Sequence, residues 1–291
     1  MSEASARPIW LCADDYGISP AVNGAIRDLA LRGRLNATSV MVAAPSFDRS
    51  EAVSLNLLNA GTPRVAVGLH VTLTGPFVPL SAGFEPVQSG AFLPLKEMLR
   101  RALLRRLQRN RLEIEVATQF QAFAAAFGRA PDFVDGHQHV HLFPQVRDAV
   151  LKVMKEVAPH AWVRQCGRVP IPMRRRFEDR KGLLLDTLSR TFRKRAAALH
   201  IATNPAFAGT YDFNAEGGPD FANLFPRFLD RMPAGGLIMC HPGKVDAELE
   251  RLDPLTHQRE REYAYFAGGE FAALLKSQGF ALAEIPARSG T

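Results

Sequence analysis

The chain alternates short apolar runs with longer segments of helical periodicity from end to end, and this alternation restricts the folds open to it. Segments in which apolar residues recur every three or four positions separate eight apolar runs of strand length. These runs are Pro8–Ala13, Ala37–Ala43, Arg64–Val71, Asp132–Gly136, Ala161–Gln165, Leu199–Thr203, Gly236–Cys240 and Phe280–Ile285. Repeated strand–helix units favour a parallel sheet covered by helices. Eight units predict an α/β fold of the (β/α) barrel type, although an open doubly wound sheet would show the same alternation.

The length of 291 residues and the hydrophobic content of 47% fit one large core. We expect a single domain over residues 1–291, because no linker divides the chain. Its least regular part, around residues 169–209, is predicted to be a basic insertion over one end of the fold. No apolar run approaches the roughly 18 residues that span a bilayer, and the N-terminus lacks the apolar region of a signal peptide. A cytoplasmic location is therefore expected.

Positive charge is concentrated in three arginine-rich segments. The net charge is +7, and the excess lies in Leu99–Arg111, Pro172–Lys181 and Arg190–Arg195. Such runs usually form solvated helix faces, but they could also bind an acidic partner such as nucleic acid or an anionic lipid surface. Because the stretch Leu99–Val116 contains no aromatic residue that could stack on a base, we predict no nucleic-acid partner.

Polar residues collect where four of the predicted strands end. The motif "CADDYG" holds Asp14 and Asp15, and "GLHVTLTG" holds His70. The first polar residue of "VDGHQHVH" is Asp135, and "MCHPG" holds His241. In barrels and in open parallel sheets, the loops at the carboxyl ends of the strands converge on one face, where functional residues gather. We therefore expect these side chains to share one site.

One carboxylate and two neutral imidazoles are a common ligand set for a catalytic divalent metal. Asp14 or Asp15, His70 and a histidine of the "HQHVH" segment could provide it. Successive side chains of an extended strand point to opposite faces, so one aspartate can bind the metal while the other accepts a proton from water. Alternatively, one aspartate caps the helix that begins near Pro20, but Ser19 is the better cap.

Three histidines stand at every second position after Asp135: His137, His139 and His141. If this segment stays extended, all four side chains share one face. A site that already holds an aspartate and His70 has room for one or two of these histidines. The others would line the pocket or hold ligands in orientation, and Asp135 is expected to orient a ligand.

His241 is a candidate proton donor to a leaving amine or alcohol, because an imidazole titrates close to neutral pH. The alternative is a buried histidine that bonds a backbone carbonyl. A barrel metallophosphoesterase would also place Asp and His ligands at strand ends, but it would generally need more carboxylates and a second metal. The sequence shows one ligand set, so phosphoester hydrolysis is the less favoured alternative.

Four motifs together resemble one family. "LCADDYGISPAVNGAI", "VGLHVTLTG", "PDFVDGHQHVHLFP" and "LIMCHPG" match, in order and spacing, the YdjC-like carbohydrate deacetylases, which include the chitooligosaccharide deacetylases. The similarity runs from about Ile9 to Phe280. It implies a distorted, TIM-like (β/α) barrel with a single catalytic domain. It also implies a hydrolase that removes the acetyl group from N-acetylated amino sugars with one divalent metal ion.

The resemblance also implies roles for individual residues. It places the metal ligands at Asp15, His70 and His137, and the general base at Asp14. His241 matches the histidine expected to act as general acid, and Arg164 matches, more weakly, an arginine near the base. The family pattern differs at Tyr16, where phenylalanine is common, and in the spacing of the histidine triplet, but neither difference touches an implied ligand.

The stretch Leu188–Phe213 is similar to the branch of this family associated with hopanoid biosynthesis. That resemblance implies N-acetylglucosaminyl hopanoid as substrate, with soluble chitooligosaccharides as the alternative. The basic residues of this stretch, interleaved with apolar ones, could rest on an anionic membrane surface, peripheral to the inner membrane, or could form an amphipathic helix that packs on the barrel. Zinc, magnesium and other divalent ions all suit an Asp-His-His set, and a helix pair around Leu99–Phe127 could mediate a homodimer.

Overall fold

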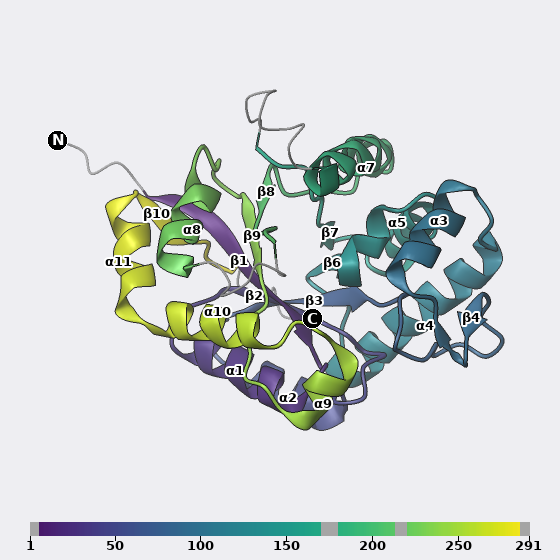
Figure 1. The fold of residues 1–291 in the computed structure, drawn as a ribbon, viewed down its shortest axis with the longest axis horizontal. Coiled ribbons are helices and arrows are strands. Elements are labelled where there is room, and N and C mark those ends of the chain that lie inside the picture. The colour runs from purple at the N-terminus through teal and green to yellow at the C-terminus, as the bar shows by residue number, and fades with distance from the viewer. Residues whose placement is uncertain (1–5, 170–179, 213–219, 286–291) are drawn as a thin grey trace.

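The computed structural model describes residues 6–169, 180–212 and 220–285 (Figure 1). The first half of the chain contains β1 (Arg7–Tyr16), α1 (Pro20–Leu31), β2 (Ala37–Val40), α2 (Arg49–Leu58), β3 (Ala66–Val71), β4 (Val87–Gln88), β5 (Ala91–Phe92), α3 (Leu95–Leu103), α4 (Arg109–Phe127), β6 (Phe133–Gly136) and the 3₁₀ helix η1 (His137–Leu142). The second half contains α5 (Val146–Val157), β7 (Trp162–Val163), α7 (Arg180–Ala198), β8 (Phe207–Ala208), α8 (Phe221–Leu229), β9 (Leu237–Cys240), α9 (Ala247–Leu252), α10 (His257–Ala267), α11 (Gly269–Ser277) and β10 (Phe280–Leu282).

The main sheet is parallel and curls into a distorted barrel. Its strand order is β7-β6-β3-β2-β1-β9-β8, and β10 pairs with the first residues of β1. Two isolated parallel bridges, Val163 to Thr203 and Arg168 to Phe207, join the segments that contain the two edge strands. The predicted α/β barrel is thus confirmed. Its closure is irregular because β7 and β8 have only two residues each.

The predicted strand Leu199–Thr203 is wrong in extent. Its first residues end a helix instead, because Leu199 donates its N–H to Arg195 and Ile201 donates its N–H to the carbonyl of Ala196. His200 takes a positive φ of 57° at this helix end. Only Thr203 pairs with the sheet, and the strand itself is β8, four residues later. In the sequence, the apolar run at the end of this helix resembles a buried strand.

Helix α1 shows why the first βα unit folds as the sequence predicts. Ser19 caps the helix by accepting a hydrogen bond from the N–H of Val22, and Pro20 occupies the first turn. Beyond the last turn, Gly33 adopts a φ of 64°, which suits glycine. The stripe Val22, Ile26, Leu29 and Ala30 is buried in the core. Neither Asp14 nor Asp15 is therefore needed as a cap.

The described part of the predicted insertion is dominated by α7, which packs on the body of the protein. Leu188 and Phe192 are buried, and the Phe192 ring meets the ring of His141 edge-on. Exposed arginine and lysine side chains cover the opposite face of α7. The basic segment Pro172–Lys181 lies outside the residues whose side chains are described. Among the described helices, none has the length and apolar character needed to cross a membrane.

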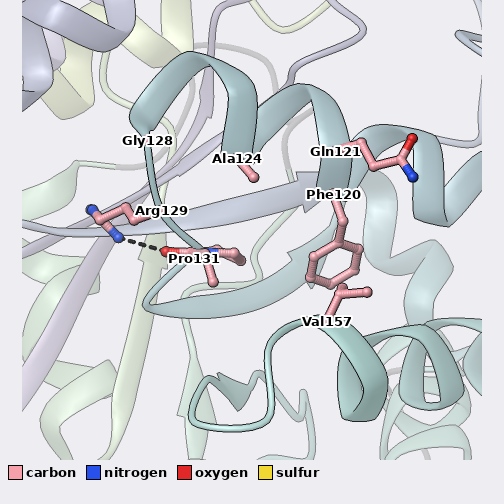
Figure 2. Close-up of a pocket in the computed structure, with 8 residues that line it drawn as sticks. Phe120, Gln121, Ala124, Gly128, Arg129, Pro131 and Val157 are labelled. Atoms are coloured by element: carbon pink, nitrogen blue, oxygen red, sulfur yellow. Dashed lines mark hydrogen bonds between the residues drawn. The ribbon is translucent and has the colours of Figure 1, made fainter. Parts of the chain in front are cut away.

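A pocket of about 310 Å³ lies where α4 ends and the chain enters β6 (Figure 2). It is lined by Phe120, Gln121, Ala124, Gly128, Arg129, Ala130, Pro131 and Val157. This position is at the amino-terminal end of β6, whereas the predicted site residues lie at the carboxyl ends of the strands. None of the predicted site residues lines the pocket, so the two features are separate.

Candidate functional site

The four polar motifs come together because they follow strands that lie near one another in the sheet. β6, β3, β2, β1 and β9 are consecutive neighbours, and the motifs end four of these five strands. The side chains of Asp14, Asp15, His70 and Asp135 are all at most 3% exposed. The site is therefore built in a nearly water-free environment, where charge interactions are strong.

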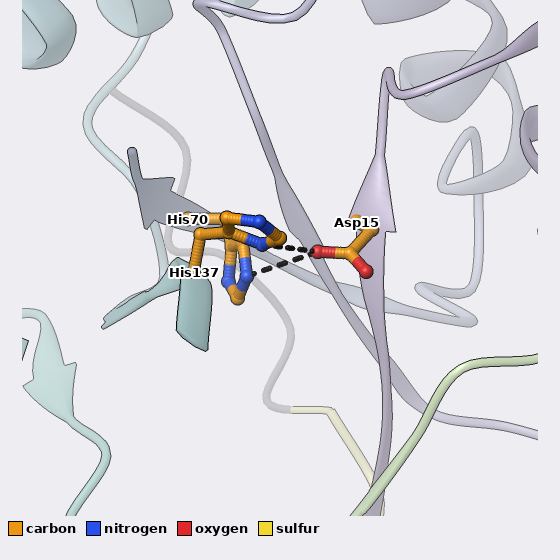
Figure 3. Close-up of side chains that lie close together, drawn as sticks. All are labelled: Asp15, His70 and His137. Atoms are coloured by element: carbon orange, nitrogen blue, oxygen red, sulfur yellow. Dashed lines mark hydrogen bonds and ion pairs between the residues drawn. The ribbon is translucent and has the colours of Figure 1, made fainter. Parts of the chain in front are cut away.

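Asp15, His70 and His137 converge on one point (Figure 3). The Asp15 Oδ1 atom lies 3.2 Å from His70 Nε2 and 3.0 Å from His137 Nδ1. One ligand atom from each residue falls within 4.8 Å of the other two. Three donors at this spacing, one carboxylate and two imidazoles, can hold a single ion.

The backbone at the end of β1 explains how the two adjacent aspartates serve different partners. Asp15 adopts a φ of 66°, and the pairing of β1 with β2 shifts register between Ala13 and Tyr16. Positive φ is sparsely populated for residues other than glycine, although Asp tolerates it better than most, and such strain clusters at functional sites. The Asp15 side chain faces the histidines, while the Asp14 side chain pairs with Arg164.

Asp135 holds His70 in place rather than joining the three donors. Its Oδ1 lies 2.6 Å from His70 Nδ1, and the Ser39 hydroxyl lies 2.9 Å from the same nitrogen. The opposite ring nitrogen, Nε2, is left to face Asp15. A carboxylate behind a histidine fixes the tautomer and the ring orientation that a metal ligand needs.

The histidine triplet is not extended, so the condition under which all four side chains would share one face is not met. The strand ends at Gly136, and η1 begins at once, with positive φ at Gln138 and His139. The chain folds back so tightly that a Cβ on Gly136 would lie 2.9 Å from the His141 ring. His141 donates from Nε2 to the Arg164 carbonyl, and burial lowers the pKa of His141 to about 4. Only His137 of the three joins Asp15 and His70.

His139 lies to one side of this group. Its ring meets the Phe207 ring edge-on at 5.7 Å, and its Nδ1 is 3.5 Å from the Cys166 sulfur. The side chain is partly exposed. The sequence placed His139 at the pocket or behind a ligand, and the structure places it beside β8, where it faces an aromatic side chain.

Asp14 forms a buried ion pair with Arg164. Both guanidinium nitrogens, Nη1 and Nη2, lie 2.6 Å from the two carboxylate oxygens. Burial by itself would raise the pKa of Asp14, but Arg164 holds it well below its usual range. Arg164 also contacts Cys12 and Asp135. The donor group Cys12, Asp14 and Asp135 therefore already surrounds a cation, the guanidinium itself.

His241 approaches the same point from β9. Its Nε2 lies 4.0 Å from Asp15 Oδ2, and its side chain is 14% exposed. Burial lowers the pKa of His241. The imidazole is therefore a stronger acid than a solvated histidine and is neutral in most molecules at pH 7.

Helix α10 contributes two buried charged residues that the sequence analysis missed. Arg259 bonds Asp15 Oδ2 at 2.6 Å and Asp253 Oδ2 at 2.6 Å. One turn later, Glu262 accepts hydrogen bonds from the Tyr211 hydroxyl at 2.6 Å and from the backbone N–H of His241 at 2.5 Å. Burial raises the pKa of Glu262 to about 7. In the sequence, "HQREREYAYF" resembles an ordinary solvated helix, and no local signal separates its buried charges from the exposed ones.

Comparison with known proteins identifies the family of this chain. The family model for YdjC-like protein matches residues 8–277. The chain belongs to the YdjC-like family. The resemblance seen in the four motifs is thus confirmed over nearly the whole sequence.

Two kinds of relative accompany the family match. A chitooligosaccharide deacetylase of Yersinia pestis (strain Pestoides F) is 30% identical over 240 residues, which is 81% of this chain and 82% of the relative. A chitooligosaccharide deacetylase of Yersinia pseudotuberculosis serotype O:1b (strain IP 31758) matches equally. A crystal structure from Enterococcus faecalis V583, provisionally assigned as a cellobiose-phosphate cleavage protein, has a TM-score of 0.74 and 19% identity, and covers 96% of this chain and 98% of its own. The last likeness shows the shared fold.

The chemistry of the donor set in this YdjC-like protein suits a divalent metal ion. Burial by itself would lower the pKa of His70, but Asp135 and the hydrogen bond to Asp15 raise it to about 10. Burial would likewise raise the pKa of Asp15, whereas Arg259 and the two histidines hold it well below its usual range. Carboxylates that stabilise the protonated, positively charged form of His70 this strongly also favour a bound cation. The group fits a metal ion of the zinc or magnesium class.

Metal affinity should therefore rise with pH. His70 carries a proton at pH 7 when its pKa is about 10, and an imidazole ligand must be neutral, so binding has to release that proton. We expect the affinity for zinc to rise by about tenfold per pH unit between about pH 6.5 and 9. Isothermal titration calorimetry in two buffers of different ionisation enthalpy measures the proton released per ion. An affinity independent of pH would contradict this prediction.

Arg259 is expected to hold Asp15 in the orientation that metal binding needs. Arg259 places Nη2 between Asp15 and Asp253 while its Nε donates to the Leu255 carbonyl. In Arg259→Gln and Arg259→Lys we expect metal affinity to fall by about 10- to 100-fold, as for other partners of metal ligands, because neither side chain has a rigid guanidinium that makes all of these contacts. Competition with a chromophoric chelator measures the affinity. Arg251→Gln, an exposed position on α9, is the control.

The lysine variant separates orientation from charge. If Arg259 acted only as a nearby positive charge, Arg259→Gln would bind the cation more tightly and Arg259→Lys would behave as wild type. Either result would show that the bridge to Asp253 has no role in holding the ligand.

Proposed function

We propose that this YdjC-like protein is a metal-dependent carbohydrate deacetylase that releases acetate from an N-acetylglucosamine-type amino sugar. The observation that carries the proposal is the convergence of Asp15, His70 and His137, with Asp14 on the adjacent position of β1. The names of the Yersinia relatives support the reaction and the substrate class. The whole chain then acts as one catalytic domain.

Each residue has a role in this proposal. Asp15, His70 and His137 hold the ion, which when bound supplies Lewis-acid polarisation of the acetamide carbonyl and a lower pKa for water. Asp14 is a carboxylate at neutral pH, because Arg164 stabilises its charge, and it accepts the proton of the attacking water. The same stabilisation makes Asp14 a weak base, so it can accept a proton only from water whose pKa has already been lowered.

The remaining groups complete the proton transfers and the orientation of the site. His241 follows Cys240 of β9, which pairs with Ala13 of β1. The imidazolium form of His241, the minor form at pH 7, donates a proton to the amine as the C–N bond breaks and returns to neutral imidazole. Glu262 fixes the backbone of His241. Asp135 orients His70, His141 supports the Arg164 backbone, and His139 lies beside Phe207.

For the acceptor we propose an N-acetylglucosaminyl group on a hopanoid lipid, with a soluble chitooligosaccharide as the alternative. The resemblance of Leu188–Phe213 to the hopanoid-associated branch supports the lipid. The exposed Arg190, Arg193 and Lys194 of α7 would favour an anionic membrane surface and a peripheral location at the inner membrane. Leu188 and Phe192 are buried in the protein, so they lend no support to membrane contact.

Two further alternatives can be weighed on the structure. A metallophosphoesterase would generally need a second ion, and the adjacent donor group around Cys12 is already filled by Arg164. A homodimer through α3 and α4 would have to use side chains other than the apolar face of α4, because Val116 and Phe123 are buried within the chain. The homodimer stays a prediction.

The proposal is tested by measuring acetate release after chelation, with and without added zinc or magnesium. The substrates are chitobiose and an N-acetylglucosaminyl hopanoid in detergent. Metal-dependent release from the hopanoid alone would support both the deacetylase and the lipid acceptor, and release from chitobiose would favour the soluble sugar. If neither substrate yields acetate with any added metal, the proposed reaction is wrong.

A further inference from the structure

Three arginines from separate elements gather at the start of α5. Arg147 lies in the first turn of this helix, Arg195 lies near the end of α7, and Arg105 lies in the turn between α3 and α4. Asp148 pairs with Arg195 at 3.3 Å and, loosely, with Arg147 at 3.8 Å. The guanidinium groups of Arg195 and Arg105 both act on Arg147, whose pKa is lowered by burial and by these two like charges. Asp148 thus pairs with two of these cations, and Arg105 adds a third positive charge that acts on Arg147.

Hydrogen bonds between a side chain and the backbone hold the turn that carries Arg105. Gln145, the residue before α5, accepts the N–H of Leu107 at 3.1 Å and donates to the Leu107 carbonyl at 2.7 Å. Leu107 is itself buried. The turn that carries Arg105 is therefore tied to the amino terminus of α5, next to Arg147.

Arg147 is the least satisfied member of this cluster. It is only 7% exposed, and its Nε has no hydrogen-bond partner among the described residues. Burying a guanidinium without a close partner is costly, and bringing two like charges toward it adds to that cost. No side chain caps the N-terminus of α5 either. The backbone N–H of Arg147 donates to the Phe143 carbonyl, but the positive end of the helix dipole still lies in the turn that carries Arg147. An anion would satisfy all of these groups.

We propose that Arg105, Arg147 and Arg195 form a binding site for a phosphate group, carried by an anionic phospholipid or by a soluble phosphate compound. Guanidinium groups match the oxygens of phosphate in bidentate geometry, and helix amino termini bind the same anion. The site lies beside the predicted catalytic centre, since α3, α5 and α7 all contact η1, the element that begins with His137 (Figure 1).

Two exposed leucines make a lipid phosphate the better-fitting source. Leu103 and Leu104 are each 52% exposed and immediately precede Arg105. Apolar side chains next to arginines suit the boundary between headgroups and acyl chains, where basic residues are attracted to anionic lipids. The arrangement would place the neighbouring catalytic face against a membrane.

The double variant Arg105→Gln/Arg195→Gln tests the site, because both positions are exposed and the substitutions should leave the fold intact. The control is Arg109→Gln/Arg227→Gln, which removes the same charge from exposed positions of α4 and α8. The probes are inorganic phosphate and glycerol 1-phosphate in calorimetry, and vesicles of phosphatidylcholine with and without phosphatidylglycerol in cosedimentation, all at one fixed ionic strength. Neither acetylated substrate nor metal is needed, so the result is independent of the proposed reaction.

We expect the test variant to bind at least tenfold more weakly than wild type, and the control to change by less than threefold. Binding of phosphatidylglycerol vesicles without binding of the soluble phosphates would assign the site to lipid, and the reverse would assign it to a soluble compound. Equal weakening in both variants would show that binding depends only on the overall positive charge, and it would overturn the proposal. So would a wild-type protein that binds none of the probes.

Discussion

Asp14→Asn is expected to lose about 10²- to 10⁴-fold in kcat, the usual contribution of a general base, while its metal affinity stays close to that of wild type. Asparagine keeps the shape of the side chain but cannot accept the proton of the attacking water. Asp14 is not among the three converging donors, so the ion keeps its ligands. Arg164 keeps its contact with Asp135 at 2.6 Å, which limits the cost of the missing charge.

The matched substitution one residue later is expected to remove the metal first, and the activity as a consequence. Asp15→Asn removes the only carboxylate among the three donors and breaks the ion pair with Arg259, so we expect the metal to be lost on dialysis and activity to disappear with it. Metal content by mass spectrometry and acetate release are measured on both variants, with thermal unfolding as a check on the fold. If Asp14→Asn lost the metal while Asp15→Asn kept it, the two roles would have to be exchanged.

Much of the fold was predictable because a parallel sheet buried on both faces leaves a strong pattern. β3, β6 and β9 each fall inside a predicted apolar run, and β1 contains the run Pro8–Ala13 and extends beyond it at both ends. Each of the four strands has its polar motif at its carboxyl end. The weakest prediction was at the barrel seam, where β7 and β8 have two residues each. Strands that short carry no periodicity, and Leu199–Thr203 shows that an apolar run can equally end a helix.

The members of the site were more predictable than its geometry. Residue type and position at strand ends pointed to Asp14 or Asp15, His70 and a histidine of the triplet, since imidazole and carboxylate side chains at one end of a sheet meet. The resemblance to the family narrowed this set to Asp15, His70 and His137. The path of the chain after Gly136 was not predictable, because it depends on two positive φ angles and on the absence of a Cβ at one position. That path, and not residue type, separates His137 from His139 and His141.

Arg259 and Glu262 were missed for a different reason. Both lie on α10, more than 100 residues after the histidine triplet, in a stretch where charged residues are dense. A buried charge is identified by what surrounds it, and here the surroundings are Asp15, Asp253 and the backbone of His241. Only the tertiary fold brings these groups together, so single-sequence reasoning had no signal to use.

β1 links the fold to the chemistry. It is the strand with three partners, because β2, β9 and β10 all pair with it. A strand held from both sides can support an unfavourable backbone conformation at its end, and Asp15 has such a conformation. The rigid sheet thus stabilises the bend that sends Asp14 and Asp15 to different partners, which a flexible loop could not do reliably.

His137→Ala is expected to lower metal affinity by more than the roughly 10- to 100-fold that follows loss of a ligand's partner, because it removes one of only three donors. His139→Ala is the matched control: it deletes the same ring two residues later, from a side chain that faces Phe207 and Cys166. The control should bind metal as wild type does. Competition against a chromophoric chelator measures both affinities, and thermal unfolding of the metal-free proteins shows whether either substitution disturbs the fold.

The comparison decides between two accounts of the triplet. If the segment were extended in solution, His139 and His141 could replace a missing His137 from the same face, and the loss of affinity in His137→Ala would be small. In the folded-back path, neither can reach the ion, since His141 is bonded to the Arg164 carbonyl and His139 lies beside β8. A large loss in His137→Ala with an unchanged His139→Ala would therefore support both the ligand assignment and the turn at Gly136 that produces it. A loss in His139→Ala with metal retained in His137→Ala would contradict both.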